Sequence, residues 1–267
     1  MTLKASSVCA SYGESLALNR VGLEVGEGEF VGLAGPNGSG KTTLIRVLSG
    51  VIEPSAGEVT LDGRNVRQIP ARELARSVAV ISQQAGSTFD FSVLETVLMG
   101  RYAHLARLRF ETARDYEVAR RCLEQTGMLH LAGRRIAQLS GGERQRTFIA
   151  RALAQEARFL LLDEPTAHLD LRHQVELMNL AAELNRKEGL GILVALHDVN
   201  LAARYCQRLL LLHEGAAVAQ GTARDVMTEQ NLWLAYGTRV RVSEDRETGA
   251  PQITIVSGTE QDGESEI

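Results

Sequence analysis

Apolar and polar positions alternate along this chain in a pattern typical of an α/β fold. Short apolar runs bounded by glycine predict buried parallel strands at residues 29–34, 78–82, 159–162, 191–196 and 208–213. Glycine turns separate three earlier segments, which predicts antiparallel strands at residues 2–11, 20–25 and 58–61. Leu177, Ala181 and Leu184 repeat at helical spacing, so we expect an amphipathic helix over residues 170–188 that stops at Gly189.

The middle of the chain, roughly residues 84–137, shows helical periodicity and few strand signals. Ser92 and Glu95 form a capping-box pattern near its start. We therefore expect a helical subdomain at about residues 84–155. Eight arginines fall between Arg101 and Arg135, and a solvated helical face is the ordinary explanation for such a cluster. A docking surface for a partner is the alternative.

Composition places the chain among ordinary globular proteins. Its 267 residues are enough for one large α/β domain with an attached subdomain. A net charge of -4 argues against a nucleic-acid partner. Three widely separated cysteines fit neither a disulfide framework nor a zinc site. The N-terminus lacks the apolar core of a signal peptide, and the longest apolar runs fall far short of the ~18 residues of a membrane span. We expect a soluble protein that reaches a membrane only through a partner.

The strongest local motif is a complete G-x-x-x-x-G-K-[ST] match between a predicted strand and a predicted helix that begins at Thr43. Its backbone N–H groups can surround phosphate oxygens as an anion nest. Lys41 can reach the β- and γ-phosphates, and the Thr42 hydroxyl can bind Mg²⁺. The segment predicts a nucleoside triphosphate site made of Gly35, Pro36, Asn37, Gly38, Ser39, Gly40, Lys41, Thr42 and Thr43.

Two carboxylates follow the predicted strand at residues 159–162 and supply the second half of that site. Asp163 suits the Mg²⁺ shell, whereas Glu164 could orient and polarise the attacking water. By itself this pair would be read as a solvated strand end. Behind a complete phosphate loop it predicts hydrolysis.

A third motif, Leu139 to Arg146, opens a predicted helix. Ser140 and Glu143 form a capping box, and a well-capped helix is the plain interpretation. Capping does not require the adjacent Gly141 and Gly142, which are costly to order. They make sense if another phosphate must approach this end of the helix closely.

This motif resembles the L-S-G-G-E signature of the ABC (ATP-binding cassette) ATPases. The resemblance implies a P-loop NTPase (RecA-like) α/β core with an antiparallel β subdomain and a helical signature subdomain. It also implies that two cassettes pack head to tail around ATP and Mg²⁺. Ser140, Gly141 and Gly142 would then contact the γ-phosphate held by Lys41 of the second cassette, which we expect to be an identical copy.

Other family landmarks follow in order and extend the resemblance over residues 2–245. Gln83 matches the glutamine that contacts Mg²⁺ and the attacking water, although Gln84 adjoins it. His197 matches the switch histidine that senses the γ-phosphate, and Tyr12 matches the aromatic residue that stacks on adenine. His168 departs from the small residue usual in the D-loop at residues 167–170. Residues 246–267 form a C-terminal extension with an acidic tail that we expect to be disordered.

Finer resemblance points to importers of iron chelates (siderophores), haem and cobalamin. It implies polytopic permease subunits, a substrate-binding protein reached indirectly, and a peripheral position on the cytoplasmic face of the inner membrane. The stretch at residues 85–104 would receive a short helix of the permease. Two alternatives stay open. In one, the chain powers the separate membrane subunit of an exporter, and in the other it belongs to a regulatory complex without a transport function. The resemblance to the importers lies at residues 197–206, 221–222, 226–228, 236–237 and 240–242.

Overall fold

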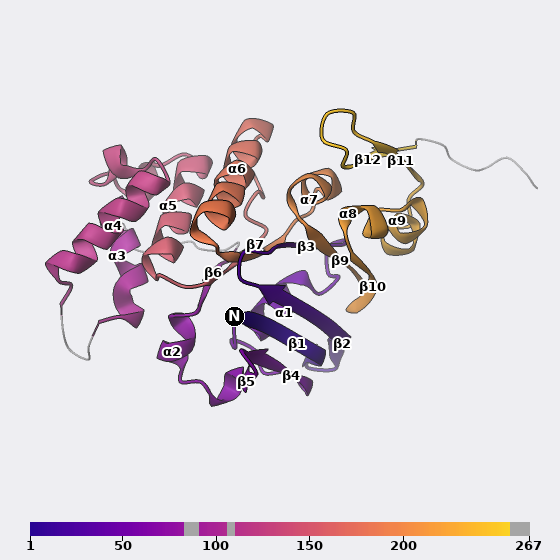
Figure 1. Ribbon diagram of the computed structural model, residues 1–267, viewed down its shortest axis with the longest axis horizontal. Helices are drawn as coiled ribbons and strands as arrows, with labels where there is room; N and C mark the ends of the chain where they lie inside the picture. Colours follow the sequence, from indigo (N-terminus) through magenta and orange to yellow (C-terminus); the bar gives the residue numbers. More distant parts are fainter. Residues whose placement is uncertain (83–90, 106–109, 257–267) are drawn as a thin grey trace, which may run out of the picture.

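A central sheet of six strands organises the protein (Figure 1). The computed structural model describes residues 1–82, 91–105 and 110–256. The strand order is β10-β9-β3-β8-β7-β6, with β10 antiparallel to its neighbour and the other five strands parallel. The five predicted parallel strands are confirmed as β3 (Phe30–Ala34), β6 (Val78–Ile81), β7 (Phe159–Asp163), β8 (Gly191–Ala195) and β9 (Arg208–His213), and β10 (Ala216–Gly221) completes the sheet.

An antiparallel sheet lies across helix α1 (Lys41–Leu48) from the central sheet (Figure 1). Its strand order is β2-β1-β4-β5. The observed β2 begins earlier than predicted because the hairpin turn after Tyr12 lets Ser15 pair at once. This sheet contains β1 (Thr2–Tyr12), β2 (Ser15–Gly26), β4 (Ala56–Leu61) and β5 (Arg64–Asn65).

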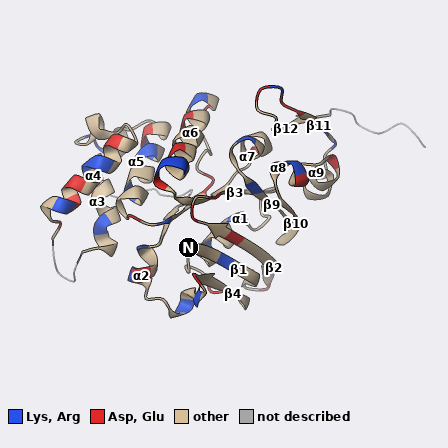
Figure 2. Cartoon of the chain, in the orientation of Figure 1, with Lys and Arg blue, Asp and Glu red and all other residues tan. Residues whose placement is uncertain are grey.

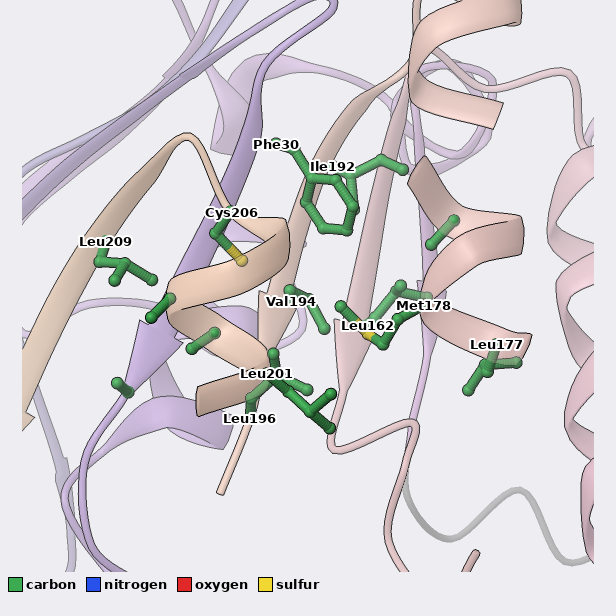
Figure 3. Packing of buried hydrophobic residues seen from close by; sticks show 14 of the residues in the cluster. Phe30, Leu162, Leu177, Met178, Ile192, Val194, Leu196, Leu201, Cys206 and Leu209 are labelled. Carbon is green, nitrogen blue, oxygen red and sulfur yellow. The ribbon is translucent and has the colours of Figure 1, made fainter. Parts of the chain in front are cut away.

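Helices α6 (Leu171–Glu188) and α7 (Val199–Tyr205) pack on the opposite face of the central sheet. Figure 3 shows Met178 of α6 and Leu201 of α7 meeting side chains of the strands at this layer. The Asp170 side chain accepts a hydrogen bond from the His173 N–H and caps α6, and Gly189 ends the helix with φ of 67°. The predicted helix is therefore confirmed at both ends.

A group of helices at one end of the sheet has its own apolar core. The capping box at Ser92 and Glu95 is present as predicted. The expectation of a solvated arginine face is wrong for Arg101, which is buried against Asp115 and Glu156. Figure 2 shows positively and negatively charged residues interspersed along the helices of this group. Its elements are α3 (Val93–Leu98), the 3₁₀ helix η2 (Met99–Ala103), α4 (Ala113–Gln125) and α5 (Gly141–Ala154), and the short α2 (Ala71–Ala75) contacts η2.

The C-terminal segment packs at the other end of the sheet (Figure 1). It contains α8 (Ala223–Val226), α9 (Glu229–Tyr236) and the antiparallel hairpin of β11 (Val240–Glu244) and β12 (Pro251–Ile255). We expected the cassette domain to end at residue 245, but β11 lies before that residue and β12 after it. Ile253 of β12 is buried in the main core, so this strand packs with the domain. The acidic tail at residues 257–267 lies outside the described residues. Across residues 1–82, 91–105 and 110–256, no helix combines the length and apolar character needed to cross a membrane.

Candidate active site

The phosphate-binding loop connects the carboxyl end of β3 to α1. Gly35 and Gly40 have φ of 144° and 103°, a region that favours glycine. A Cβ atom on Gly35 would lie 2.2 Å from the Leu212 carbonyl oxygen, so a larger residue cannot occupy this position without moving the backbone. Gly40 is the N-cap residue of α1 and directs the helix N-terminus into the loop. The loop has the backbone conformation that the predicted anion-binding nest requires.

Lys41 is buried inside this loop. Its ammonium group donates hydrogen bonds to the carbonyl oxygens of Gly35 at 2.8 Å and Pro36 at 2.9 Å. Burial lowers the pKa of Lys41, while the negative charges of Glu164 and Asp163 raise it. The two hydrogen bonds hold the Lys41 ammonium group against the loop, where a phosphate would need it.

Thr42 and Asp163 join the phosphate loop to the end of β7. The Thr42 hydroxyl donates a hydrogen bond to Asp163 Oδ1 at 2.9 Å. Burial raises the pKa of Asp163, while the bond from Thr42 lowers it. Mg²⁺ prefers oxygen ligands and commonly uses one or two protein side chains with substrate phosphates and water. This hydroxyl and carboxylate fit that requirement.

Glu164 and His197 meet at the edge of the same site. His197 Nε2 lies 2.6 Å from Glu164 Oε2. The Glu164 side chain is 12% exposed and that of His197 is 43% exposed, so the pair faces solvent mainly through the imidazole. Glu164 has φ of 51°, an uncommon conformation for a side chain of this size, and such strain is concentrated at functional sites. A carboxylate in this position can accept a proton from a water molecule.

The signature segment begins α5 with the predicted capping box. Ser140 Oγ accepts a bond from the Glu143 N–H, and Glu143 Oε2 accepts one from the Ser140 N–H. Ser140 and Gly141 are exposed, so this helix N-terminus is accessible. Gly142 has a packing reason within the chain: a Cβ there would lie 2.6 Å from His173 Cδ2. Among the described residues, no hydrogen bond or ion pair connects this segment to the phosphate loop.

The remaining predicted residues occupy different places. Tyr12 ends β1 half-exposed, and its hydroxyl accepts a bond from Arg46 of α1 at 3.4 Å. Gln83 lies outside the described residues. His168 has φ of 62° in the turn before α6. Sequence reasoning missed His173, whose Nδ1 lies 2.7 Å from Asp170 Oδ1, although the spacing of these two residues in a helix could have indicated the contact.

Comparison with known proteins identifies the family. The ABC transporter family matches residues 18–167. Ferric enterobactin transport ATP-binding protein FepC of Escherichia coli strain K12 is 37% identical over 96% of this chain and 95% of its own length. Hemin import ATP-binding protein HmuV of Bordetella avium is 41% identical over 91% and 94%. Cobalamin import ATP-binding protein BtuD of Halobacterium salinarum is 39% identical over 95% of this chain, which spans only 63% of that protein.

Solved structures agree with these relatives. An ABC transporter described as of metal-chelate type, in an inward-facing conformation, matches with a TM-score of 0.84 and 28% identity over 96% of this chain and 97% of that one. A dimeric bacterial ABC transporter cassette matches with a TM-score of 0.73 and 31% identity over 82% and 98%. The phosphate loop, the carboxylates after β7 and the signature helix therefore have the arrangement of a known ATP-binding fold, and the chain belongs to the ABC transporter ATP-binding family.

Proposed function

We propose that this protein is the ATP-hydrolysing subunit of an ABC importer for an iron chelate, haem or cobalamin. The observation that carries the ATPase activity is the convergence of Lys41, Thr42, Asp163, Glu164 and His197 at the carboxyl ends of β3, β7 and β8. The importer class is supported by relatives that are 37% to 41% identical along nearly the whole chain and carry the names of such systems.

In the proposed reaction, the phosphate loop and Lys41 bind the triphosphate. Lys41 exchanges its bonds to the Gly35 and Pro36 carbonyl groups for bonds to the β- and γ-phosphate oxygens. Thr42 and Asp163 would hold Mg²⁺, which supplies positive charge beside the transferred phosphoryl group. Gln83 is expected to contribute to the same shell, and Tyr12 is expected to stack on adenine.

Glu164 then orients and polarises the attacking water, and His197 contacts the γ-phosphate. The 2.6 Å contact between these two side chains supports a shared role, because His197 can hold the carboxylate in place while it accepts a proton. The imidazole must also turn toward phosphate, which its exposure permits.

The second cassette completes the site. Ser140, Gly141 and Gly142 present an accessible helix N-terminus that can receive the γ-phosphate held by another copy. We propose a homodimer that docks on polytopic permease subunits at the cytoplasmic face of the inner membrane, with a substrate-binding protein on the far side. Residues 85–104 are the expected permease contact, although residues 83–90 lie outside the described residues.

The test is Glu164→Gln in the purified protein. We expect ATP binding to persist, turnover to fall by at least roughly a hundredfold, and an ATP-dependent dimer to accumulate on size-exclusion chromatography. Glu183→Gln is the matched control, because Glu183 lies on the exposed side of α6 and pairs only with Lys187 in the described residues. Normal turnover in Glu164→Gln would remove this residue from its role.

The cargo is tested in cells that lack the protein. Uptake of a ferric siderophore, haem and cobalamin is measured separately, and loss of one uptake that the wild-type gene restores identifies the cargo. Co-purification with a polytopic membrane protein in detergent is expected. Undiminished uptake of all three compounds would contradict the importer assignment while leaving the ATPase activity intact.

A further inference from the structure

The first turns of α5 and α6 lie against each other, and the two signature glycines make this contact possible. Figure 1 shows the two helices side by side. A Cβ atom on Gly142 would lie 2.6 Å from His173 Cδ2, and a Cβ on Gly141 would lie 3.2 Å from Leu169 Cδ2. Gly142 is buried, whereas Ser140 and Gly141 are exposed. Leu169 and His173 therefore cover the signature glycines on one side and leave Ser140 and Gly141 accessible.

Asp170 holds the ring of His173 in this position. Nδ1 of His173 lies 2.7 Å from Asp170 Oδ1, and the His173 backbone N–H donates to the same oxygen at 2.9 Å. Hydrogen bonds from the backbone and side chain of His173 lower the pKa of Asp170, so this group is a carboxylate that only accepts. Nδ1 must then carry the proton, which fixes the tautomer and the direction of the ring. The other edge of the ring, at Cδ2, faces Gly142.

The turn between β7 and α6 connects this contact to Glu164. The Ala167 N–H donates to the Glu164 carbonyl oxygen at 3.1 Å, and the Leu169 N–H donates to the Thr166 carbonyl oxygen at 3.3 Å. The Gln174 side chain of α6 donates to the Leu169 carbonyl oxygen at 3.0 Å. One hydrogen-bonded turn thus joins the carboxylate proposed to polarise water to the side chains that cover the signature glycines.

We propose that His173 is a positioning residue for the signature, which it holds in a fixed orientation relative to the turn that carries Glu164. The capping box of Ser140 and Glu143 orders this helix end within α5 but makes no connection to α6. In the proposed dimer, Ser140 and Gly141 contact the ATP of the second cassette, while Glu164 acts on the ATP of its own chain. His173 therefore links the parts of one chain that serve two different ATP molecules. This inference rests on the dimer proposed above.

The test compares His173→Asn with His173→Leu, two side chains of similar shape that differ in hydrogen bonding. The Asn amide can replace Nδ1 as the donor to Asp170 and keeps an atom in the place of Cδ2, whereas Leu fills the same space without a donor. Both are made in Glu164→Gln, and its ATP-dependent dimer is followed by analytical ultracentrifugation over a series of protein concentrations. We expect the dimer Kd to stay within about twofold of the parent in His173→Asn and to rise at least roughly tenfold in His173→Leu.

ATP binding to the monomer separates positioning from a general loss of structure. Among the described residues, no hydrogen bond or ion pair joins His173 to the phosphate loop, so the monomer's Kd for ATP should be the same in both variants and the parent. Lys187→Ala, at the far end of α6, is the control and should change neither Kd. Equal dimer Kd values for His173→Asn and His173→Leu, or monomer ATP binding that weakens in step with dimerisation, would overturn the inference alone. A parent that binds no ATP or does not dimerise would overturn the proposed function as well.

The contact between His173 and Gly142 gives a second test, in which the sign of the effect reverses. Gly142 lies in the first turn of α5 without a positive φ, and alanine is the better helix former at such a position. With His173 present, Gly142→Ala should lower Tm by about 3 °C or more, because the added Cβ meets the ring. In the His173→Ala background, the same substitution should leave Tm equal or raise it. A fall in Tm of the same size in both backgrounds would overturn the contact and the inference with it.

Discussion

A buried ion pair in the helical region lies against the end of the signature helix α5. Arg101 Nε donates to Asp115 Oδ1 at 3.0 Å, and the two side chains are only 4% and 8% exposed. Arg101 also donates to the Ala154 carbonyl oxygen at the end of α5. Burial raises the pKa of Asp115, but hydrogen bonds from Thr112 and the charge of Arg101 outweigh it and lower the pKa from 3.8 to about 2. The ionised carboxylate therefore stabilises the fold.

We predict that Asp115→Asn destabilises the protein by about 2 kcal/mol, because nearly two pKa units are involved and each corresponds to about 1.4 kcal/mol. Water screens this pair little, so the estimate needs no large reduction for exposure. For a chain of this size, the corresponding fall in Tm is about 4–8 °C at pH 7. Glu183→Gln, which removes an exposed pair, should change Tm by less than about 2 °C.

The pH dependence gives a sharper test of the same reasoning. A carboxyl group whose pKa is lowered on folding contributes its stability above the unfolded pKa, and this contribution disappears as pH falls toward the folded value. The Tm difference between wild type and Asp115→Asn should be constant from pH 8 to pH 5 and shrink below about pH 4. A difference under about 1 °C at pH 7, or one that closes between pH 7 and pH 5, would refute the assignment. Scanning fluorimetry across this pH series supplies the measurement.

Two further substitutions test the phosphate site. Gly35→Ala should weaken ATP binding by at least roughly tenfold, because the added Cβ meets the Leu212 carbonyl oxygen. Gly133→Ala is the control and should leave the Kd for ATP unchanged, because open space surrounds Gly133. Equal Kd values for the two variants would contradict the steric argument. Asp163→Asn should abolish Mg²⁺-dependent ATPase activity while Tm at pH 7 stays equal or rises. Burial raises the pKa of Asp163, so the folded protein loses stability as pH rises through that pKa and the carboxylate ionises. Removing the charge should therefore leave the stability equal or higher at pH 7. A large drop in the Tm of Asp163→Asn would contradict this expectation.

The sequence could predict those parts of the molecule that depend on local patterns. The strands of the central sheet were predictable because Phe159 to Leu162 and similar runs are apolar on both faces, as buried parallel strands require. The Thr42–Asp163 contact followed from placing two motifs at the carboxyl ends of strands in one sheet. Such motifs specify a site before any coordinate is known.

Other features depend on contacts between distant segments and carry no local signal. The burial of Arg101 depends on the packing of α4 against α5. The other arginines of this cluster that the structure describes are exposed as expected, namely Arg114, Arg120, Arg121, Arg134 and Arg135. The packing of α9 against β9 and β10 likewise requires the chain to return to the central sheet after β10. Gly142 was attributed to the approach of phosphate, but its contact with His173 gives it a second reason that only the packing of α5 on α6 reveals.

The reactive side chains of the site bond to one another within the chain. Lys41 bonds the loop carbonyls, Thr42 bonds Asp163, and Glu164 contacts His197. ATP must therefore exchange these bonds for its own, and the net free energy of an exchanged hydrogen bond is only about 1 kcal/mol. Binding to one cassette gains little from such exchange. Ser140 and Gly141 are exposed, and among the described residues the side chain of the capping Glu143 is the one that bonds to the Ser140 amide. Contact with a second cassette would therefore add interactions while breaking few hydrogen bonds within the chain. This difference would make the proposed reaction depend on the second cassette even though one chain holds a full set of residues.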